Sequence, residues 1–211
     1  MKESLTGTAR LALALLLFSG AVAHATTAPS SSFDFACQES LTRPILDPNA
    51  CLAALSASDA DGTMANTVRR GRLFSLLGIL HARLENLQRA REYMDDAVAL
   101  AGDDYVVSSN TGILLLREQD FTGAVERFNS AINSIPEGNN AHLTKAPIHF
   151  NRALAMSALG EYEAARIDYQ RYRQLTRPAE TLDGPWPPES VAPKATTLPL
   201  VPPVTLDSPV E

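Results

Sequence analysis

The sequence is poor in the residue types that favour β-strands. Aromatic residues make up 6% of the 211 residues, and alanine and leucine dominate the apolar set. Because strands favour β-branched and aromatic side chains, this balance predicts helices rather than a sheet. With 45% hydrophobic and 20% charged residues, the chain has the composition of a folded globular protein rather than a disordered one.

Positive charge is also scarce. The chain carries 18 Lys and Arg against 24 Asp and Glu, which gives a formal net charge of −6. Proteins that bind nucleic acid need cationic side chains to neutralise phosphates. The charge balance therefore argues against a nucleic acid partner.

Residues with the spacing of a catalytic or metal centre are missing. The sequence contains no Gly-x-Ser-x-Gly turn, no glycine-rich phosphate loop and no helix with paired zinc-binding histidines. Of its four histidines, His142 and His149 lie seven positions apart, but no Cys or acidic residue accompanies them at ligand spacing. We therefore expect a protein that is not an enzyme and that needs no cofactor or metal.

The first 25 residues have the organisation of a secretory signal peptide. Lys2 and Arg10 give a basic start, residues 11–18 form an apolar run, and residues 23–25 supply a small-x-small cleavage pattern. The run is shorter than the roughly 20 residues that span a bilayer, so no stable membrane anchor is expected. We predict cleavage after Ala25 and a periplasmic or secreted mature protein.

Only two cysteines are present, Cys37 and Cys51, at positions 14 residues apart. In an exported protein such a pair is most simply a disulfide. A redox pair is the alternative, although redox cysteines usually stand two residues apart at a helix start. We predict a linker and a disulfide-bearing helical cap over residues 26–63, with a helix that opens at Asp47-Pro48.

Small residues recur at a fixed spacing through the middle of the chain. Twelve residues separate the two members of each of three pairs: Gly78 and Ala90, Gly112 and Ala124, and Ala153 and Ala165. The first two pairs are 34 residues apart, and a large side chain follows each second member by four positions: Met94, Phe128 and Tyr169. Small residues let two helix axes approach, and the large residue fills the space beside them. A period in this range indicates stacked helical units.

These residues resemble the tetratricopeptide repeat, a 34-residue unit of two antiparallel helices with a small residue midway along each. The family's first-helix pattern is present as Phe74, Leu77-Gly78 and His81. Its turn and second-helix pattern is present as Gln119-Asp120-Phe121 before Ala124 and as Gly160-Glu161-Tyr162 before Ala165. The resemblance implies an all-α, right-handed superhelical array within residues 64–177, with three helix pairs at about 71–104, 105–138 and 146–177.

The sequence departs from this repeat pattern in two places. The second and third units are 41 residues apart, and we assign the seven extra residues to a polar loop from Glu137 to Lys145. That loop is either a tolerated insertion or part of a binding face. Tyr172 replaces the small residue expected in the last helix, which indicates that this end of the array is capped differently.

The composition changes again after Arg177. Nine of the 14 prolines lie between Pro178 and Pro209, and the single tryptophan, Trp186, stands among them. We predict that residues 178–211 are a disordered, polyproline-leaning tail rather than a domain. The tail is either solvated or a docking segment, since a stiff extended peptide loses little entropy on binding.

The resemblance also implies a binding site. In tetratricopeptide proteins the first helices of the units line a concave groove that binds peptides. The residues here that would face it are Ser75, Leu76, Ile79, Arg83, Asn110, Ile113, Leu116, Arg117, Phe150, Asn151 and Leu154. Asn110 and Asn151 fall at equivalent positions, where an amide can donate and accept hydrogen bonds with a peptide backbone, or can be a surface amide without a special role.

These residues together predict an exported, non-enzymatic adaptor that binds an extended peptide or a helix of an unknown partner protein. The clamp that some family members use for chaperone tails needs lysines and an arginine on the first helices, and only Asn110 matches it. The rival interpretation is a structural or accessory subunit of a cell-envelope complex that self-associates or whose groove is filled by its own tail. An unrecognised enzyme activity comes third.

Overall fold

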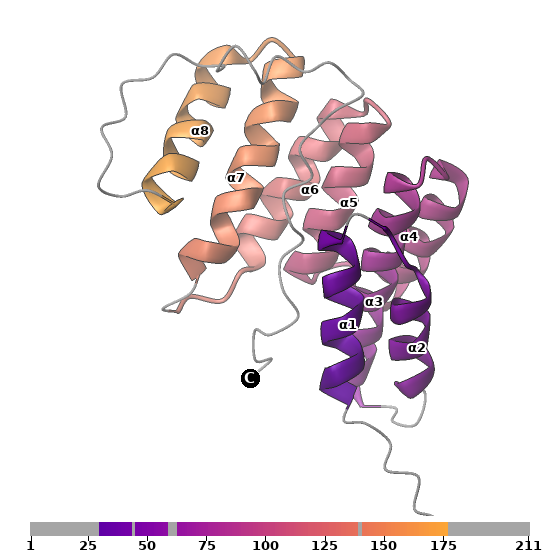
Figure 1. The fold of residues 1–211 in the computed structure, drawn as a ribbon. Helices are drawn as coiled ribbons and strands as arrows, with labels where there is room; N and C mark the ends of the chain where they lie inside the picture. Colours follow the sequence, from indigo (N-terminus) through magenta and orange to yellow (C-terminus); the bar gives the residue numbers. More distant parts are fainter. Residues whose placement is uncertain (1–29, 44, 59–62, 139–140, 177–211) are drawn as a thin grey trace, which may run out of the picture.

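The computed structural model describes residues 30–43, 45–58, 63–138 and 141–176, which form helices and no strands (Figure 1). The all-α prediction is confirmed. The predicted signal peptide and the proline-rich tail lie outside the described residues. The helices are α1 (Ser30–Thr42), α2 (Asn49–Ala57), α3 (Met64–Arg83), α4 (Leu87–Ala101), α5 (Tyr105–Arg117), α6 (Phe121–Ser134), α7 (Ala141–Ala158) and α8 (Tyr162–Thr176).

Consecutive helices pack as antiparallel hairpins: α1 with α2, α3 with α4, α5 with α6 and α7 with α8 (Figure 1). The last three hairpins correspond to the predicted helix pairs. The N-terminal cap is a hairpin of its own, formed by α1 and α2. The helix α1 begins at Ser30, near the start of the range 26–63 predicted as linker and cap. No helix of the described residues is long and apolar enough to cross a membrane.

The predicted disulfide is confirmed, since Cys37 on α1 and Cys51 on α2 are bonded, with their Cα atoms 4.4 Å apart. Both side chains are fully buried. The predicted start of α2 is close to the observed one: the helix begins at Asn49, and the Asp47 carboxylate accepts a hydrogen bond from the Asn49 amide. Because the disulfide joins α1 to α2, it links the two helices of the first hairpin covalently.

The small residues of the repeat lie where two helices touch. A Cβ added at Gly78 would meet the Ala90 carbonyl oxygen at 3.1 Å, and one added at Gly112 would lie 2.7 Å from the Phe128 ring. A Cβ at Gly112 has no room beside the ring as it stands, and one at Gly78 would need its neighbours to shift by a few tenths of an ångström. The glycines thus allow the two helices of each hairpin to approach closely. The packing reason inferred from the sequence is confirmed at both sites.

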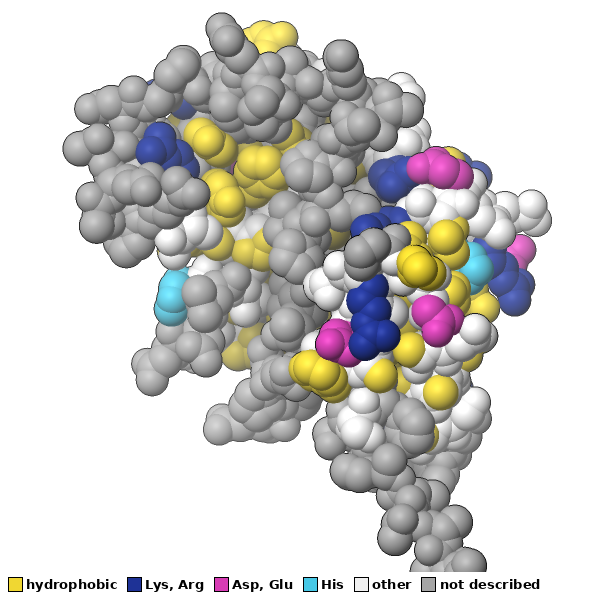
Figure 2. Space-filling model, viewed as in Figure 1, with side chains coloured by type: hydrophobic (Ala, Val, Ile, Leu, Met, Phe, Trp, Pro, Cys, Tyr) yellow, Lys and Arg dark blue, Asp and Glu magenta, His cyan; other side chains and the backbone are white. Residues whose placement is uncertain are grey.

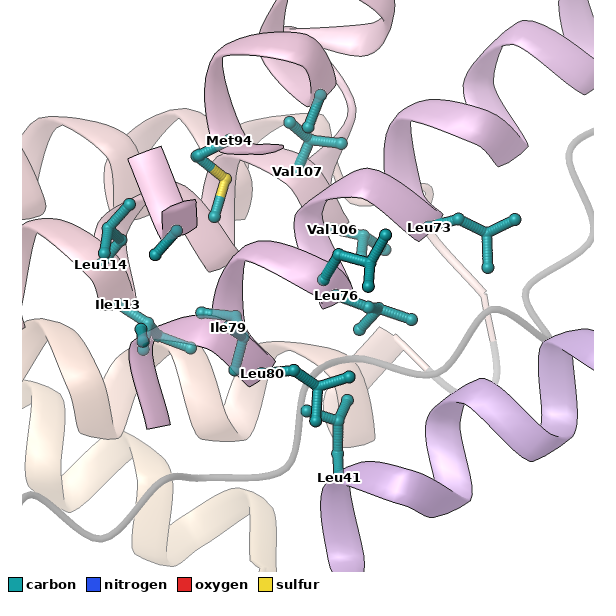
Figure 3. Close-up of a cluster of buried hydrophobic side chains, with 14 of the residues drawn as sticks. Leu41, Leu73, Leu76, Ile79, Leu80, Met94, Val106, Val107, Ile113 and Leu114 are labelled. Carbon is teal, nitrogen blue, oxygen red and sulfur yellow. The ribbon is translucent and has the colours of Figure 1, made fainter. Parts of the chain in front are cut away.

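One apolar core runs from α1 to α7, and Figure 3 shows part of it. On α3, Leu73, Leu76 and Leu80 are fully buried, and Leu41 of α1 lies beside Leu80. Val106 of α5 extends the cluster to the next hairpin. Since α3 contacts α1, α2, α4 and α5, it is the central helix of this part of the molecule.

The helix α7 is longer than predicted. It begins at Ala141, so Ala141 to Lys145 form its first turn instead of the end of a polar loop. The loop prediction is wrong for these residues, because it took their polarity as a sign of irregular structure although Ala and Lys favour helices. Pro147 lies inside the helix, where its lack of an amide hydrogen removes one backbone hydrogen bond. Lys145 forms an ion pair with Glu137 at 2.8 Å.

Candidate peptide-binding face

The residues predicted to line a groove lie on α3, α5 and α7, the first helices of three hairpins, and we call this surface the inner face. Every one of them is buried except Arg83 and Arg117, which are partly exposed. Ile79, Ile113 and Leu116 belong to the apolar core. The apolar contact expected of these three side chains is therefore made with neighbouring helices.

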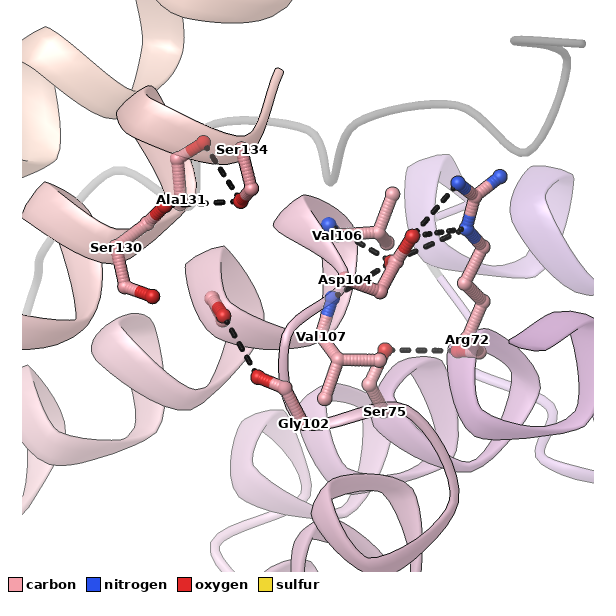
Figure 4. Close-up of polar contacts among 10 residues, drawn as sticks. Arg72, Ser75, Gly102, Asp104, Val106, Val107, Ser130, Ala131 and Ser134 are labelled. Carbon is pink, nitrogen blue, oxygen red and sulfur yellow. Dashed lines mark hydrogen bonds and ion pairs between the residues drawn. The ribbon is translucent and has the colours of Figure 1, made fainter. Parts of the chain in front are cut away.

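Asn110 of α5 is the most constrained polar residue of the inner face. It is fully buried, and its Nδ2 donates a hydrogen bond to Ser75 Oγ of α3 at 2.9 Å. Ser75 Oγ in turn donates to the Arg72 carbonyl at 2.7 Å (Figure 4). A serine hydroxyl has one hydrogen, so Ser75 can only accept from Asn110. This network fixes the orientation of the Asn110 amide.

The carbonyl oxygen of that amide has no partner among the residues that the structure describes. Asn110 Oδ1 is buried and accepts no hydrogen bond from any described residue. A buried acceptor without a donor costs about 1–3 kcal/mol. Asn151, at the equivalent position on α7, is also buried. The inner face therefore contains one oriented amide oxygen that is buried and has no donor among the described residues.

The two cations of the inner face are already engaged. Arg83 donates to the Leu41 carbonyl at the end of α1, and Arg117 forms an ion pair with Glu85 at 2.6 Å. The role of Arg83 could not be found from the sequence, because α1 was not predicted to lie against α3. Figure 2 shows that cationic side chains over the first four helices lie beside acidic ones rather than in a separate patch.

A second polar cluster joins α7 to α8. Asp168 accepts hydrogen bonds from Arg152 Nε at 2.5 Å and from Arg152 Nη2 at 2.7 Å, and its Oδ1 lies 2.9 Å from His149 Nδ1. Burial acts to raise the pKa of Asp168, but the hydrogen bonds from Arg152 and His149 outweigh burial and hold this pKa below 3.8. Arg152 of α7 donates to both carboxylate oxygens of Asp168 on α8, so the cluster stabilises the contact between the two helices of the last hairpin.

A stack of rings lies on the outer side of α3 and α4. His81 stacks on Tyr93, with ring centroids 5.2 Å apart, and Arg89 lies 4.9 Å above the Tyr93 ring. His81 Nδ1 is buried and has no partner among the residues that the structure describes. Burial, with a contribution from the charge of Arg89, lowers the pKa of His81 below 6.5.

We expect His81 to make the protein less stable in mild acid. Its pKa is lower in the folded chain than in the unfolded chain, so the unfolded chain binds the proton more readily. Above pH 6.5 neutral His81 makes its full contribution to the free energy of unfolding. This contribution is lost as the pH falls through the lower pKa that His81 has in the folded chain. Replacing His81 by Phe keeps the stack and should flatten the free energy of unfolding between about pH 5 and 7, as measured by urea titration.

The matched control for that titration is His142→Phe, since His142 is exposed on α7. This variant should keep the pH dependence of the wild type. An unchanged slope in His81→Phe would contradict the assignment to His81.

Among the described residues, no group of three or more His, Cys, Asp or Glu side chains is arranged to hold a metal ion. No protein-family model matches this sequence, and no curated protein is similar enough to match it.

Proposed function

We propose that this protein is an exported, non-enzymatic adaptor that binds an extended peptide segment of a partner protein on its inner face. The consecutive helix hairpins and the recurring small residues between their helices support a tetratricopeptide-type superhelical stack. In such a stack α3, α5 and α7 share the concave side. The structural disulfide between Cys37 and Cys51 supports export, because disulfides persist in oxidising compartments.

The observation that carries this proposal is the orphaned oxygen of Asn110. Ser75 holds the amide in one orientation before any ligand arrives, so little conformational entropy remains to be lost on binding. An extended peptide has free backbone N–H groups, and one of them would satisfy Asn110 Oδ1 once the helices around this buried atom move apart. The ligand would thereby remove an existing cost in the free protein as well as gain a contact.

The charges of the inner face support recognition through the peptide backbone. Arg83 and Arg117 already have partners in the protein, a carbonyl and a carboxylate. A strongly acidic ligand would have to displace them. Backbone hydrogen bonds to Asn110 and Asn151, with apolar contact from Phe150 and Leu154, would displace no charged partner, but they require these buried side chains to become accessible to the peptide.

We expect Asn110→Ala to weaken peptide binding by roughly 3- to 10-fold, the loss of one hydrogen bond. The test begins with selection of binding peptides from a display library on immobilised residues 26–211. The dissociation constant of the tightest selected peptide is then measured by fluorescence polarisation for wild type, Asn110→Ala and the double variant with Asn151→Ala. The double variant should bind more weakly than the single variant.

Asn133→Ala is the matched control, because Asn133 is an exposed amide on α6. It should bind the peptide as the wild type does. Circular dichroism should show equal helicity in all four proteins. Equal affinities for wild type and the double variant would overturn the proposal. It would also be overturned if the library gave no peptides, or only peptides that do not compete with one another for binding.

A further inference from the structure

The C-terminal end of the described helices has a cluster of three aromatic rings, which we call the end face: the buried Phe150 of α7 with the partly buried Tyr169 and Tyr172 of α8. The Phe150 ring lies 5.1 Å from the Tyr172 ring and 6.4 Å from the Tyr169 ring, measured between centroids, and the two tyrosine rings are 6.0 Å apart. Phe150, predicted to line the groove, contributes its ring to this cluster. Figure 2 shows hydrophobic side chains together with a cationic one over α7 and α8.

The corresponding residues of the earlier hairpins are buried, and each of those hairpins is followed by another. Met94 and Ala97 of α4, like Phe128 and Ala131 of α6, are almost completely buried, and α5 and α7 pack on these two helices. Tyr169 and Tyr172 hold the same repeat positions on α8 but are only partly buried. The end face is thus the place where one more element would pack.

That element is not another helix of the repeat. The earlier hairpins have alanine, Ala97 and Ala131, at the position that Tyr172 holds in the last one. A small residue there lets the next helix approach closely, whereas the Tyr172 ring holds a helix axis away. A thinner, extended segment fits above a surface of rings, as extended proline-rich peptides fit aromatic grooves.

We propose that the end face binds the chain's own C-terminal segment, residues 178–211, in an extended conformation centred on Trp186. The segment has the required chemistry, since it contains nine prolines, and Trp186 lies between Pro185 and Pro187. Prolines hold a peptide extended and reduce the entropy lost on docking.

The connection between the two parts has a suitable length. The helix α8 ends at Thr176, about 6 Å along the helix axis from Tyr172. Residues 177–185 span at most about 30 Å when extended, enough to turn and return Trp186 to the end face. A short tether gives an effective concentration on the order of millimolar, so even a weak interaction becomes intramolecular docking.

Charge favours the same occupant. The α8 helix carries Arg171 and Arg173 near its C-terminal end, and Glu180, Asp183 and Glu189 flank Trp186. Residues 178–211 contain five acidic side chains and one lysine, so the whole segment is anionic. A cationic end of α8 and an anionic segment tethered to it attract each other.

This docking goes beyond the adaptor role and does not depend on it. The two faces share Phe150, but the end face also uses Tyr169 and Tyr172 of α8, whereas the oriented amide of the inner face is on α5. The tail would act as the terminal cap of the helical stack, and a repeat array needs such a cap for solubility and stability.

The single tryptophan makes a direct test possible in the full mature chain. Trp186 fluorescence is excited at wavelengths that tyrosine does not absorb, and its quenching by acrylamide is compared with that of a synthetic peptide of residues 178–211. Docking predicts a blue-shifted emission and a quenching constant several-fold lower than that of the free peptide. Tyr172→Ala should move both values to those of the peptide, and the matched control Tyr162→Ala, an exposed tyrosine on α8, should leave them unchanged.

A second variant avoids any effect on the helices. Replacing Glu180, Asp183 and Glu189 with lysine changes only the tail, and it should raise the quenching constant while circular dichroism stays the same. Wild-type quenching equal to that of the peptide overturns the proposal. Protection that grows with protein concentration would mean docking on a second copy, and release by Asn110→Ala would mean docking on the inner face; either result also overturns it.

Discussion

Replacing Asp104 with alanine is expected to lower the free energy of unfolding by about 3–5 kcal/mol, the cost of leaving a buried charge without its partner. Arg72 of α3 donates to the Asp104 carboxylate from Nε at 3.1 Å and from Nη2 at 2.7 Å (Figure 4). Only 6% of the Arg72 side chain and 9% of the Asp104 side chain are exposed. Without Asp104 the guanidinium stays buried between the second and third hairpins with no opposite charge.

Asp104 also begins a helix. Its carboxylate accepts hydrogen bonds from the amides of Val106 at 3.0 Å and Val107 at 3.3 Å, so it caps α5 while it binds Arg72. Loss of an N-cap alone costs about 1 kcal/mol. The ion pair should therefore account for most of the effect of Asp104→Ala.

Urea unfolding of three variants separates the two roles. Asp104→Asn keeps a good cap but removes the charge, and it should lose nearly as much stability as Asp104→Ala. Asp103→Ala, at the exposed neighbouring position, is the control and should change little. A loss of only about 1 kcal/mol in Asp104→Ala would show that the ion pair contributes nothing beyond the cap.

The sequence was sufficient to predict the helix hairpins because their packing depends on local spacing. Gly78 and Gly112 stand at fixed distances from Ala90 and Ala124, and both glycines lie at helix contacts in the structure. The disulfide was predictable from the isolation of its two cysteines. These features need only the order of residues along the chain.

The features that the sequence did not predict depend on contacts between distant segments. The helix α1 has weak apolar periodicity, and it is held by Asp34, whose carboxylate accepts from Arg69 Nε and Nη2 at 2.6 Å. Nothing near Asp34 in the sequence indicates this partner. Polarity alone likewise predicts a loop at the start of α7, because it does not distinguish an exposed helical turn from irregular chain.

In the candidate site, too, local spacing predicts some features, while others depend on contacts between distant segments. The position of Asn110 followed from the repeat spacing, but the bond from Asn110 to Ser75 crosses from α5 to α3 and joins residues 35 positions apart. The orphaned oxygen is a consequence of that bond. The burial of Ile79 and Ile113 was also beyond the sequence, since a groove position and a core position carry the same apolar residue types.

The effect of Gly112→Ala on the free energy of unfolding should change sign when Phe128 is replaced by alanine. Phe128 of α6 is fully buried against α5, so Phe128→Ala is expected to cost about 3–5 kcal/mol through lost burial and the cavity left behind. In the wild type, Gly112→Ala should cost about 1–3 kcal/mol, because the new Cβ would lie 2.7 Å from a ring that the core holds in place.

In the Phe128→Ala background the ring is gone, and Gly112→Ala should then stabilise the protein. Alanine is about 1 kcal/mol better than glycine inside a helix, and its methyl group fills part of the new cavity. The double variant should therefore be more stable than Phe128→Ala alone, as measured by urea unfolding in a double-mutant cycle. If the two losses of stability simply added, Gly112 and Phe128 would not interact. Close packing would then not explain why glycine recurs at these positions.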